Sequence, residues 1–115
     1  MGAAIAYFSS KGYGISIPLT DSQDYDLVID IDGSLKKVQV KTTTYKTKYG
    51  SYSFSVSVKG GNKSNNRIKK FDNTCVDFVF IITGEGKLYF IPSKRLGSSS
   101  ATLNNTYDDC LLISQ

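Results

Sequence analysis

The chain has 115 residues, of which 40% are hydrophobic and 12% aromatic, and it carries a formal net charge of +4 at pH 7. This length supports one hydrophobic core but not two, so we expect a single domain spanning residues 1–115. No apolar run approaches the roughly 20 residues that span a bilayer, and no basic and then apolar leader opens the chain. We therefore expect a soluble, cytoplasmic protein without a membrane partner.

Histidine is absent, and the two cysteines, Cys75 and Cys110, lack the CxxC spacing of metal sites. This composition excludes a Cys/His zinc site and any His-based catalytic triad. In a reducing compartment, both cysteines are expected to be free, buried thiols.

The first elements in chain order are a helix and a strand. Residues 2–11 are rich in alanine and aromatic side chains, which suits a helix packed on a sheet, and Gly12 closes it. Residues 13–19 predict a first strand, with Pro18 marking its exposed end. Residues 20–24 are polar turn sequence.

Residues 25–43, YDLVIDIDGSLKKVQVKTT, predict a β-hairpin. Apolar and polar residues alternate on both arms, with the apolar set at Leu27, Ile29, Ile31, Val38 and Val40. Between the arms stands Asp32-Gly33, a pair that tolerates the positive φ angles of a two-residue type I′ turn. With this turn the numbers of paired residues sum to 65, so Ile31 faces Ser34.

The same register brings polar side chains together on what we expect to be the outer face of the hairpin. Asp26 lies across from Gln39, and Lys41 points the same way one step along. Mg²⁺ prefers oxygen ligands, so Asp26, the Gln39 amide oxygen and a backbone carbonyl such as that of Val40 are candidates to hold it. Such a patch suits Mg²⁺-assisted cleavage of a phosphodiester bond. In that reaction Lys41 would lower the pKa of the attacking water and offset the negative charge that builds on phosphorus. An ordinary half-buried hairpin also shows polar residues on its outer face, so alternation alone does not distinguish a metal site from a solvated surface.

The middle of the chain is strongly basic. Residues 36–70 hold no acid and these basic residues: Lys36, Lys37, Lys41, Lys46, Lys48, Lys59, Lys63, Arg67, Lys69 and Lys70. Scattered lysines are usual on a solvated face, but such a block beside a candidate nuclease motif favours contact with the DNA backbone.

Two loops within this block are candidates for DNA contact. Residues 45–50 form a basic loop with interleaved aromatics, which is equally typical of an ordinary hairpin loop. Residues 51–58, SYSFSVSV, predict a third strand of an antiparallel meander, with Tyr52, Phe54, Val56 and Val58 facing the core. Residues 59–67 contain no apolar side chain, and their Gly, Asn and Arg suit phosphate and base-edge contacts, although composition alone indicates a flexible loop.

The remaining elements are expected to complete one mixed sheet, and the protein as a whole should have a low helix content. Residues 68–71 are expected to begin a short helical turn, residues 76–83 form a nearly continuous apolar run typical of a central strand, and residues 87–91 form another strand. Residues 98–105 read as a polar loop. Residues 107–113 predict an edge strand or a docked tail.

Asp26 followed, after the hairpin, by Gln39-Val40-Lys41 resembles the split motif of the PD-(D/E)XK nuclease superfamily, with Gln39 in the place of the usual acid. The runs IAYFSSKGY, SIPLTDSQDYDLVIDIDG, VQVKTT, KKFDN and YFIPSK resemble one branch of it, the small homing endonucleases of cyanobacterial group I introns and their bacterial and phage relatives. The similarity spans residues 5–95. It implies an α/β (or α+β) restriction-endonuclease-like core, in which an N-terminal helix precedes a mixed, largely antiparallel sheet.

The resemblance also implies an activity: Mg²⁺-dependent (or Mn²⁺-dependent) cleavage of double-stranded DNA by an intron-associated homing endonuclease, without a small-molecule cofactor, in a bacterial or phage-infected cell. Asp26, Gln39 and Lys41 would be catalytic, with Asp26, Gln39 and Val40 on the metal. The expected DNA-binding residues, from the basic block and the segment after residue 91, are Lys46, Lys48, Lys59, Lys63, Asn65, Asn66, Arg67, Lys69, Lys70, Lys94 and Arg95.

In that branch the first helix begins with a Gly-Glu pair whose glutamate helps to hold the metal, whereas Met1 and Gly2 stand at that place here and Glu85 is the only glutamate. The resemblance therefore implies weak metal binding and slow cutting or none. By strand spacing, Asp24 is nearer to Asp26 than Asp30 is, so it is the better substitute acid. It also implies a homo-oligomer, dimer or tetramer. Two alternatives stay open: a DNA-binding protein with a vestigial site, and a structure-specific nuclease that acts on four-way junctions. An RNA-binding β-module is a weaker third.

Overall fold

The computed structural model of the chain describes residues 1–20, 24–44, 46, 48, 50–55, 58–59, 68–69, 76–96, 100–103 and 105–113. Its elements, in chain order, are α1 (Gly2–Ser10), β1 (Gly14–Ser16), β2 (Leu27–Ile31), β3 (Ser34–Thr43), β4 (Tyr52–Ser55), β5 (Val58–Lys59), β6 (Ile68–Lys69), β7 (Phe78–Thr83), β8 (Leu88–Pro92), the 3₁₀ turn η1 (Ser93–Arg95), β9 (Ser100–Leu103), the 3₁₀ helix η2 (Asn105–Cys110) and β10 (Leu111–Ile113).

Six strands form the main sheet in the order β1-β2-β3-β7-β8-β10. All neighbouring pairs are antiparallel except β3 and β7, which run parallel with Val38 beside Phe78 and Thr43 beside Thr83. Two small ladders, β4-β9 and β5-β6, lie outside this sheet. The fold is thus a helix followed by a mixed, mostly antiparallel sheet, as the sequence predicts.

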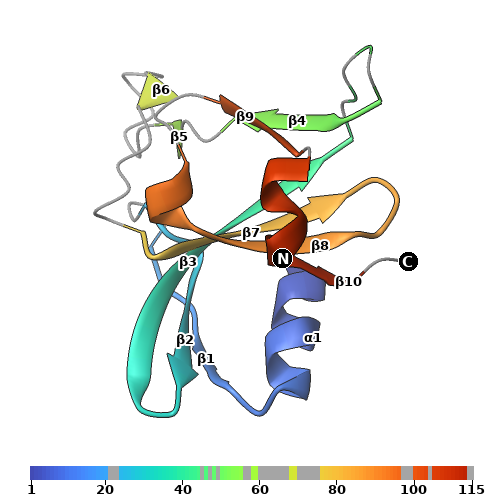
Figure 1. The fold of residues 1–115 in the computed structure, drawn as a ribbon. Helices are drawn as coiled ribbons and strands as arrows, with labels where there is room; N and C mark the ends of the chain where they lie inside the picture. Colours follow the sequence, from blue (N-terminus) through green and yellow to red (C-terminus); the bar gives the residue numbers. More distant parts are fainter. Residues whose placement is uncertain are drawn as a thin grey trace.

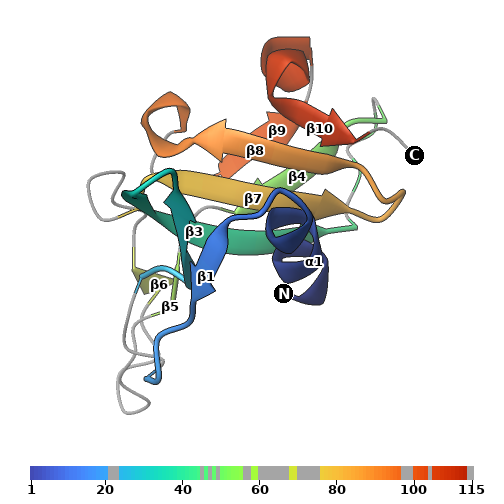
Figure 2. The ribbon, with the colours of Figure 1, turned by 90° about the horizontal axis from the view of Figure 1, so that it is seen from below.

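The main sheet is covered on both faces. Helix α1 lies on one face, across β3 and β7, and β4 with β9 lies on the other (Figures 1 and 2). Because β7 is central and covered on both sides, a nearly continuous apolar sequence is what this strand requires. Among the described residues no helix is long and apolar enough to span a membrane.

The helix side has its own core. Phe8 of α1 packs edge-on against Phe80 of β7, with ring centroids 5.2 Å apart. The buried residues of this cluster are Ala4, Phe8, Leu27, Ile29, Val38, Phe80 and Leu88. Ala4 and Phe8 are four positions apart and therefore share one face of the helix.

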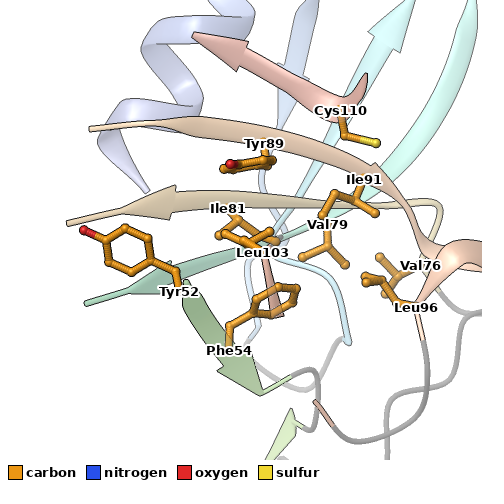
Figure 3. Close-up of a cluster of buried hydrophobic side chains, with 10 residues drawn as sticks. All are labelled: Tyr52, Phe54, Val76, Val79, Ile81, Tyr89, Ile91, Leu96, Leu103 and Cys110. Atoms are coloured by element: carbon orange, nitrogen blue, oxygen red, sulfur yellow. The ribbon is translucent and has the colours of Figure 1, made fainter. Parts of the chain in front are cut away.

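The opposite core is shown in Figure 3, where side chains of β4 and β9 meet those of β7 and β8. Its buried members are Tyr52, Phe54, Val76, Val79, Ile81, Tyr89, Ile91, Leu96, Leu103 and Cys110. Cys110 is a buried free thiol, as expected. Cys75 lies outside the described residues.

The predicted meander is wrong at its third strand. Tyr52 and Phe54 do face a core, but β4 pairs antiparallel with β9, and the neighbour of β3 is β7. The alternating sequence of residues 51–55 suits a strand with one buried face, so it fits the covering layer. The more apolar β7 takes the doubly covered position.

Two further predictions for the second half are wrong. Residues 68–69 form strand β6 against β5, so their backbone groups serve a sheet ladder and not a helical turn. The polar segment 98–105 contains β9, whose Leu103 is buried opposite Tyr52. Residues 107–113 supply the end of η2 and then the edge strand β10.

Candidate active site

The β2-β3 hairpin has the predicted turn and register. Asp32 and Gly33 have φ angles of 52° and 89°, and the Gly33 N–H donates to Asp30 Oδ1 at 2.7 Å. Ile31 pairs with Ser34 and Leu27 with Val38. Asp26 precedes Leu27 and lies just beyond the last of these pairs.

Asp26 ends the β2 ladder. Its N–H donates to the Val38 carbonyl at 2.9 Å, and its carboxylate Oδ2 accepts the Val40 N–H at 2.7 Å. The carboxylate thus accepts a β3 N–H that a backbone carbonyl would accept if β2 continued. The Asp26 side chain is nevertheless exposed. Asp26 has a structural role that its position on the hairpin did not indicate.

Gln39 is buried, with 4% of its surface exposed, so the prediction of an outward-facing side chain is wrong. It lies beside Val79 of β7, whose side chain belongs to the core between the main sheet and β4-β9. The Gln39 Oε1 atom has no hydrogen-bond partner among the described residues. A buried carbonyl oxygen left in this way costs about 1–3 kcal/mol, which marks it as a candidate ligand atom.

Lys41 is half-buried on the same face of β3, beside Ile81. Burial lowers the pKa of its ammonium group, and the Asp26 carboxylate acts in the opposite direction by attraction. The two side chains are therefore near enough to interact electrostatically.

The oxygens of this site fit a hard divalent cation in type. The Val40 N–H points at Asp26, and because the N–H and C=O of a strand residue point to the same side, its carbonyl faces that edge as well. A carboxylate, an unpartnered amide oxygen and a carbonyl are ligands that Mg²⁺ accepts. Within the described part of the chain no three acidic, Cys or His side chains gather as a metal site. Asp26 is thus the one acid of the predicted ligand set.

The sequence model of the PD-(D/E)XK endonuclease family matches residues 2–109. The chain belongs to this family. It is also similar to a solved structure entitled as a bacterial homing endonuclease, I-Ssp6803I, with 30% sequence identity and a TM-score of 0.75 over 93% of this chain and 74% of that one. No curated protein sequence matches it significantly. PD-(D/E)XK endonucleases act on DNA and generally use divalent metals, so this chain is an endonuclease of that family.

The predicted DNA-binding residues of this endonuclease do not all lie together. Lys46 forms an ion pair with Glu85, and its ammonium lies 5.1 Å from the centre of the Tyr52 ring. Lys46 forms an isolated bridge with Tyr52, at the start of β4, whereas β5 follows the end of that strand. The basic block is therefore divided in space.

Lys94, on the turn η1, is exposed. Arg95 donates to Asp109 Oδ2 at 2.8 Å and lies 5.3 Å from the Tyr107 ring centre. Of the remaining predicted contacts, Lys59 and Lys69 stand on β5 and β6. The others, Lys63, Asn65, Asn66, Arg67 and Lys70, lie outside the described residues.

Asp77, which sequence reasoning missed, ends the other ladder of β3. Its N–H donates to the Lys37 carbonyl at 2.9 Å, and its Oδ2 accepts the Lys37 N–H at 2.9 Å. A signal was present: Asp77-Phe78-Val79-Phe80 repeats the pattern Asp26-Leu27-Val28-Ile29, an aspartate directly before an apolar strand. The endonuclease thus uses one aspartate on each side of β3.

Proposed function

We propose that this chain is a single-domain, Mg²⁺-dependent endonuclease that cuts double-stranded DNA as a homing enzyme. The observation that carries the proposal is the buried Oε1 atom of Gln39, which has no hydrogen-bond partner among the described residues. Gln39 is next to Lys41 on the same face of β3 and stands between Val38 and Val40, the two residues to which Asp26 hydrogen-bonds. A purely structural hairpin gains nothing from burying an unsatisfied amide oxygen. The similarity to a bacterial homing endonuclease supports the choice of substrate.

In this proposal Asp26, Gln39 and the Val40 carbonyl hold Mg²⁺, which when bound makes water a better nucleophile and offsets phosphate charge. Asp26 also keeps Val40 in place through its hydrogen bond to the Val40 N–H. Lys41 presents its ammonium to the scissile phosphate and stabilises the charge that builds there. Its partial burial strengthens that attraction, because fewer waters compete.

A second candidate is a DNA-binding protein with a vestigial site. It is favoured by the single carboxylate of the ligand set, since one carboxylate holds Mg²⁺ weakly. Asp24, half-buried two residues before Asp26, is the nearest further acid on this arm. If Asp24 assists, Asp24→Asn raises the Mg²⁺ concentration needed for cutting.

The deciding experiment incubates the purified chain with plasmid fragments and with four-way junctions, in Mg²⁺, in Mn²⁺ and in EDTA. Metal-dependent cutting of linear duplex that Lys41→Met abolishes supports the homing endonuclease. Cutting of junctions alone supports a structure-specific nuclease, and tight binding without cutting supports the vestigial site.

The β5-β6 side is proposed as the principal DNA contact. Joint replacement of Lys59, Lys63 and Arg67 by Ala should weaken DNA binding and flatten its dependence on salt. Lys46 and Arg95 already have acidic partners, so single Ala variants there should change affinity less. An unchanged salt slope in the triple variant would remove that segment from the interface.

We further propose a cytoplasmic homo-oligomer, dimer or tetramer, because a chain of this length covers little DNA and a symmetric assembly reads a longer site. Light scattering coupled to gel filtration measures the mass directly. A monomer at all concentrations contradicts this part of the proposal.

A further inference from the structure

A second lysine stands beside the candidate active site. Lys37, Gln39 and Lys41 alternate along β3 and so point to the same face of the sheet. Asp26 hydrogen-bonds to Val38 and to Val40, so Lys37 and Lys41 stand before and after the stretch of β3 that Asp26 contacts. One lysine therefore stands on each side of that stretch.

Lys37 is held in place at both its backbone and its side chain. Asp77 accepts its N–H and donates to its carbonyl, each at 2.9 Å. Its ammonium lies 5.5 Å from the centre of the Tyr25 ring. Tyr25 is half-buried against the core beneath β4 and β9, and it directly precedes Asp26. The aromatic ring is thus an anchored support for the Lys37 ammonium, next to the metal-binding carboxylate.

The two lysines differ in exposure, which gives them different tasks. Lys41 is half-buried, whereas Lys37 is exposed and available to a polyanion. A phosphate seated between Asp26 and Lys41 has neighbouring phosphates along the same DNA strand. Lys37 stands on the side of Asp26 away from Lys41, where such a neighbour would pass.

We infer that Lys37, supported by Tyr25, contacts a DNA phosphate adjacent to the scissile one and so fixes the register of the strand across Asp26. This inference rests on the proposed function and adds a contact outside the Gln39-Val40-Lys41 motif. Lys37 is the residue that touches the substrate. Tyr25 is a positioning residue that acts through Lys37.

Lys36 offers a matched control. It is the next residue on the same strand, but it pairs with Ile29, whose side chain lies in the core on the helix side. Lys36 thus points to the opposite face. The variants Lys37→Met and Lys36→Met each remove one charge and keep most of the aliphatic stem.

The test measures binding of the full chain to a labelled random-sequence duplex in EDTA over a series of salt concentrations, and cutting in Mg²⁺. For Lys37→Met the slope of log affinity against log salt should fall in magnitude by about 0.9, the value of one phosphate contact. Cutting should slow with it, and Lys37→Arg should restore both. Lys36→Met should leave the slope unchanged.

Two variants of Tyr25 test whether its ring positions Lys37 or only packs against the core. Tyr25→Phe keeps the ring and should match the original chain, whereas Tyr25→Leu should weaken binding toward the Lys37→Met value. Urea unfolding of each variant checks that it folds. If Lys37→Met folds and keeps the salt slope and cutting rate of Lys36→Met, the inference is overturned while the proposed function stands. A chain that neither binds nor cuts duplex DNA overturns both.

Discussion

Asp26 has a structural role in the hairpin and, in the proposed function, a metal-binding role, and substitution can separate the two. Its Oδ2 atom accepts the Val40 N–H at 2.7 Å, a short hydrogen bond with a charged acceptor. Because the side chain is exposed, water can partly replace it, so we assign Asp26→Ala a loss of about 1 kcal/mol in the free energy of unfolding. Asp26→Asn keeps an oxygen acceptor and should lose roughly half of that.

This loss is measurable as a melting temperature. An unfolding entropy of roughly 2.1 cal/mol/K per residue makes 1 kcal/mol equivalent to about 4 °C in a chain of this size. Asp26→Ala should therefore melt about 4 °C lower and Asp26→Asn about 2 °C lower. Both should fail to cut plasmid DNA in Mg²⁺. Asp26→Asn should bind DNA as well as the original chain or more tightly, since a negative charge near phosphate is gone.

Asp30→Asn is the control, because Asp30 is also exposed and also accepts a backbone N–H at 2.7 Å, from Gly33. It should destabilise the chain as Asp26→Asn does and leave cutting intact. An Asp26→Asn protein that cuts at the original rate would refute the metal assignment. Equal melting temperatures for Asp26→Ala and the original chain would refute the structural role.

The other predictions concern burial and backbone conformation. Gln39→Met removes a buried unpaired oxygen and should raise the free energy of unfolding by about 1 kcal/mol in urea titrations, while abolishing cutting; a destabilised variant would contradict this account of Oε1. Gly33 has a φ of 89°, so Gly33→Ala should cost about 1 kcal/mol or more, whereas Gly2→Ala, where a Cβ meets nothing within 4 Å, should cost nothing. Burial raises the pKa of the Cys110 thiol, so in a Cys75→Ser protein it should react with a disulfide reagent far more slowly than in urea; equal rates would argue against its burial.

The sequence was most informative where structure is decided locally. The Asp32-Gly33 pair set the turn, and with the turn known, the register from Ile31 with Ser34 to Leu27 with Val38 followed. The N-terminal helix and the apolar strand β7 were also predictable, since each carries its own periodicity or a continuous apolar run.

The periodicity of a strand does not show which other strand it pairs with. Residues 51–55 alternate equally well as a third strand of a meander or as part of a second layer, and the partner strand β9 has the composition of a loop. The burial of Gln39 follows from that same arrangement, because β7 and β9, which help to cover it, come from far along the chain. The environment of Gln39 was therefore not foreseen from the sequence.

The parallel pairing of β3 with β7 also affects how the endonuclease folds. The β2-β3 hairpin is local and should form within about 1–10 μs, but the contact between Lys37 and Asp77 joins residues 40 positions apart. Such long-range pairing slows folding, because a large loop is closed before the contacts that stabilise it form. At about 5–20 residues per second, the ribosome needs roughly 2–8 s to make this stretch. Until then Gln39 stays hydrated, so we expect the nascent endonuclease to be inactive until β7 has been made.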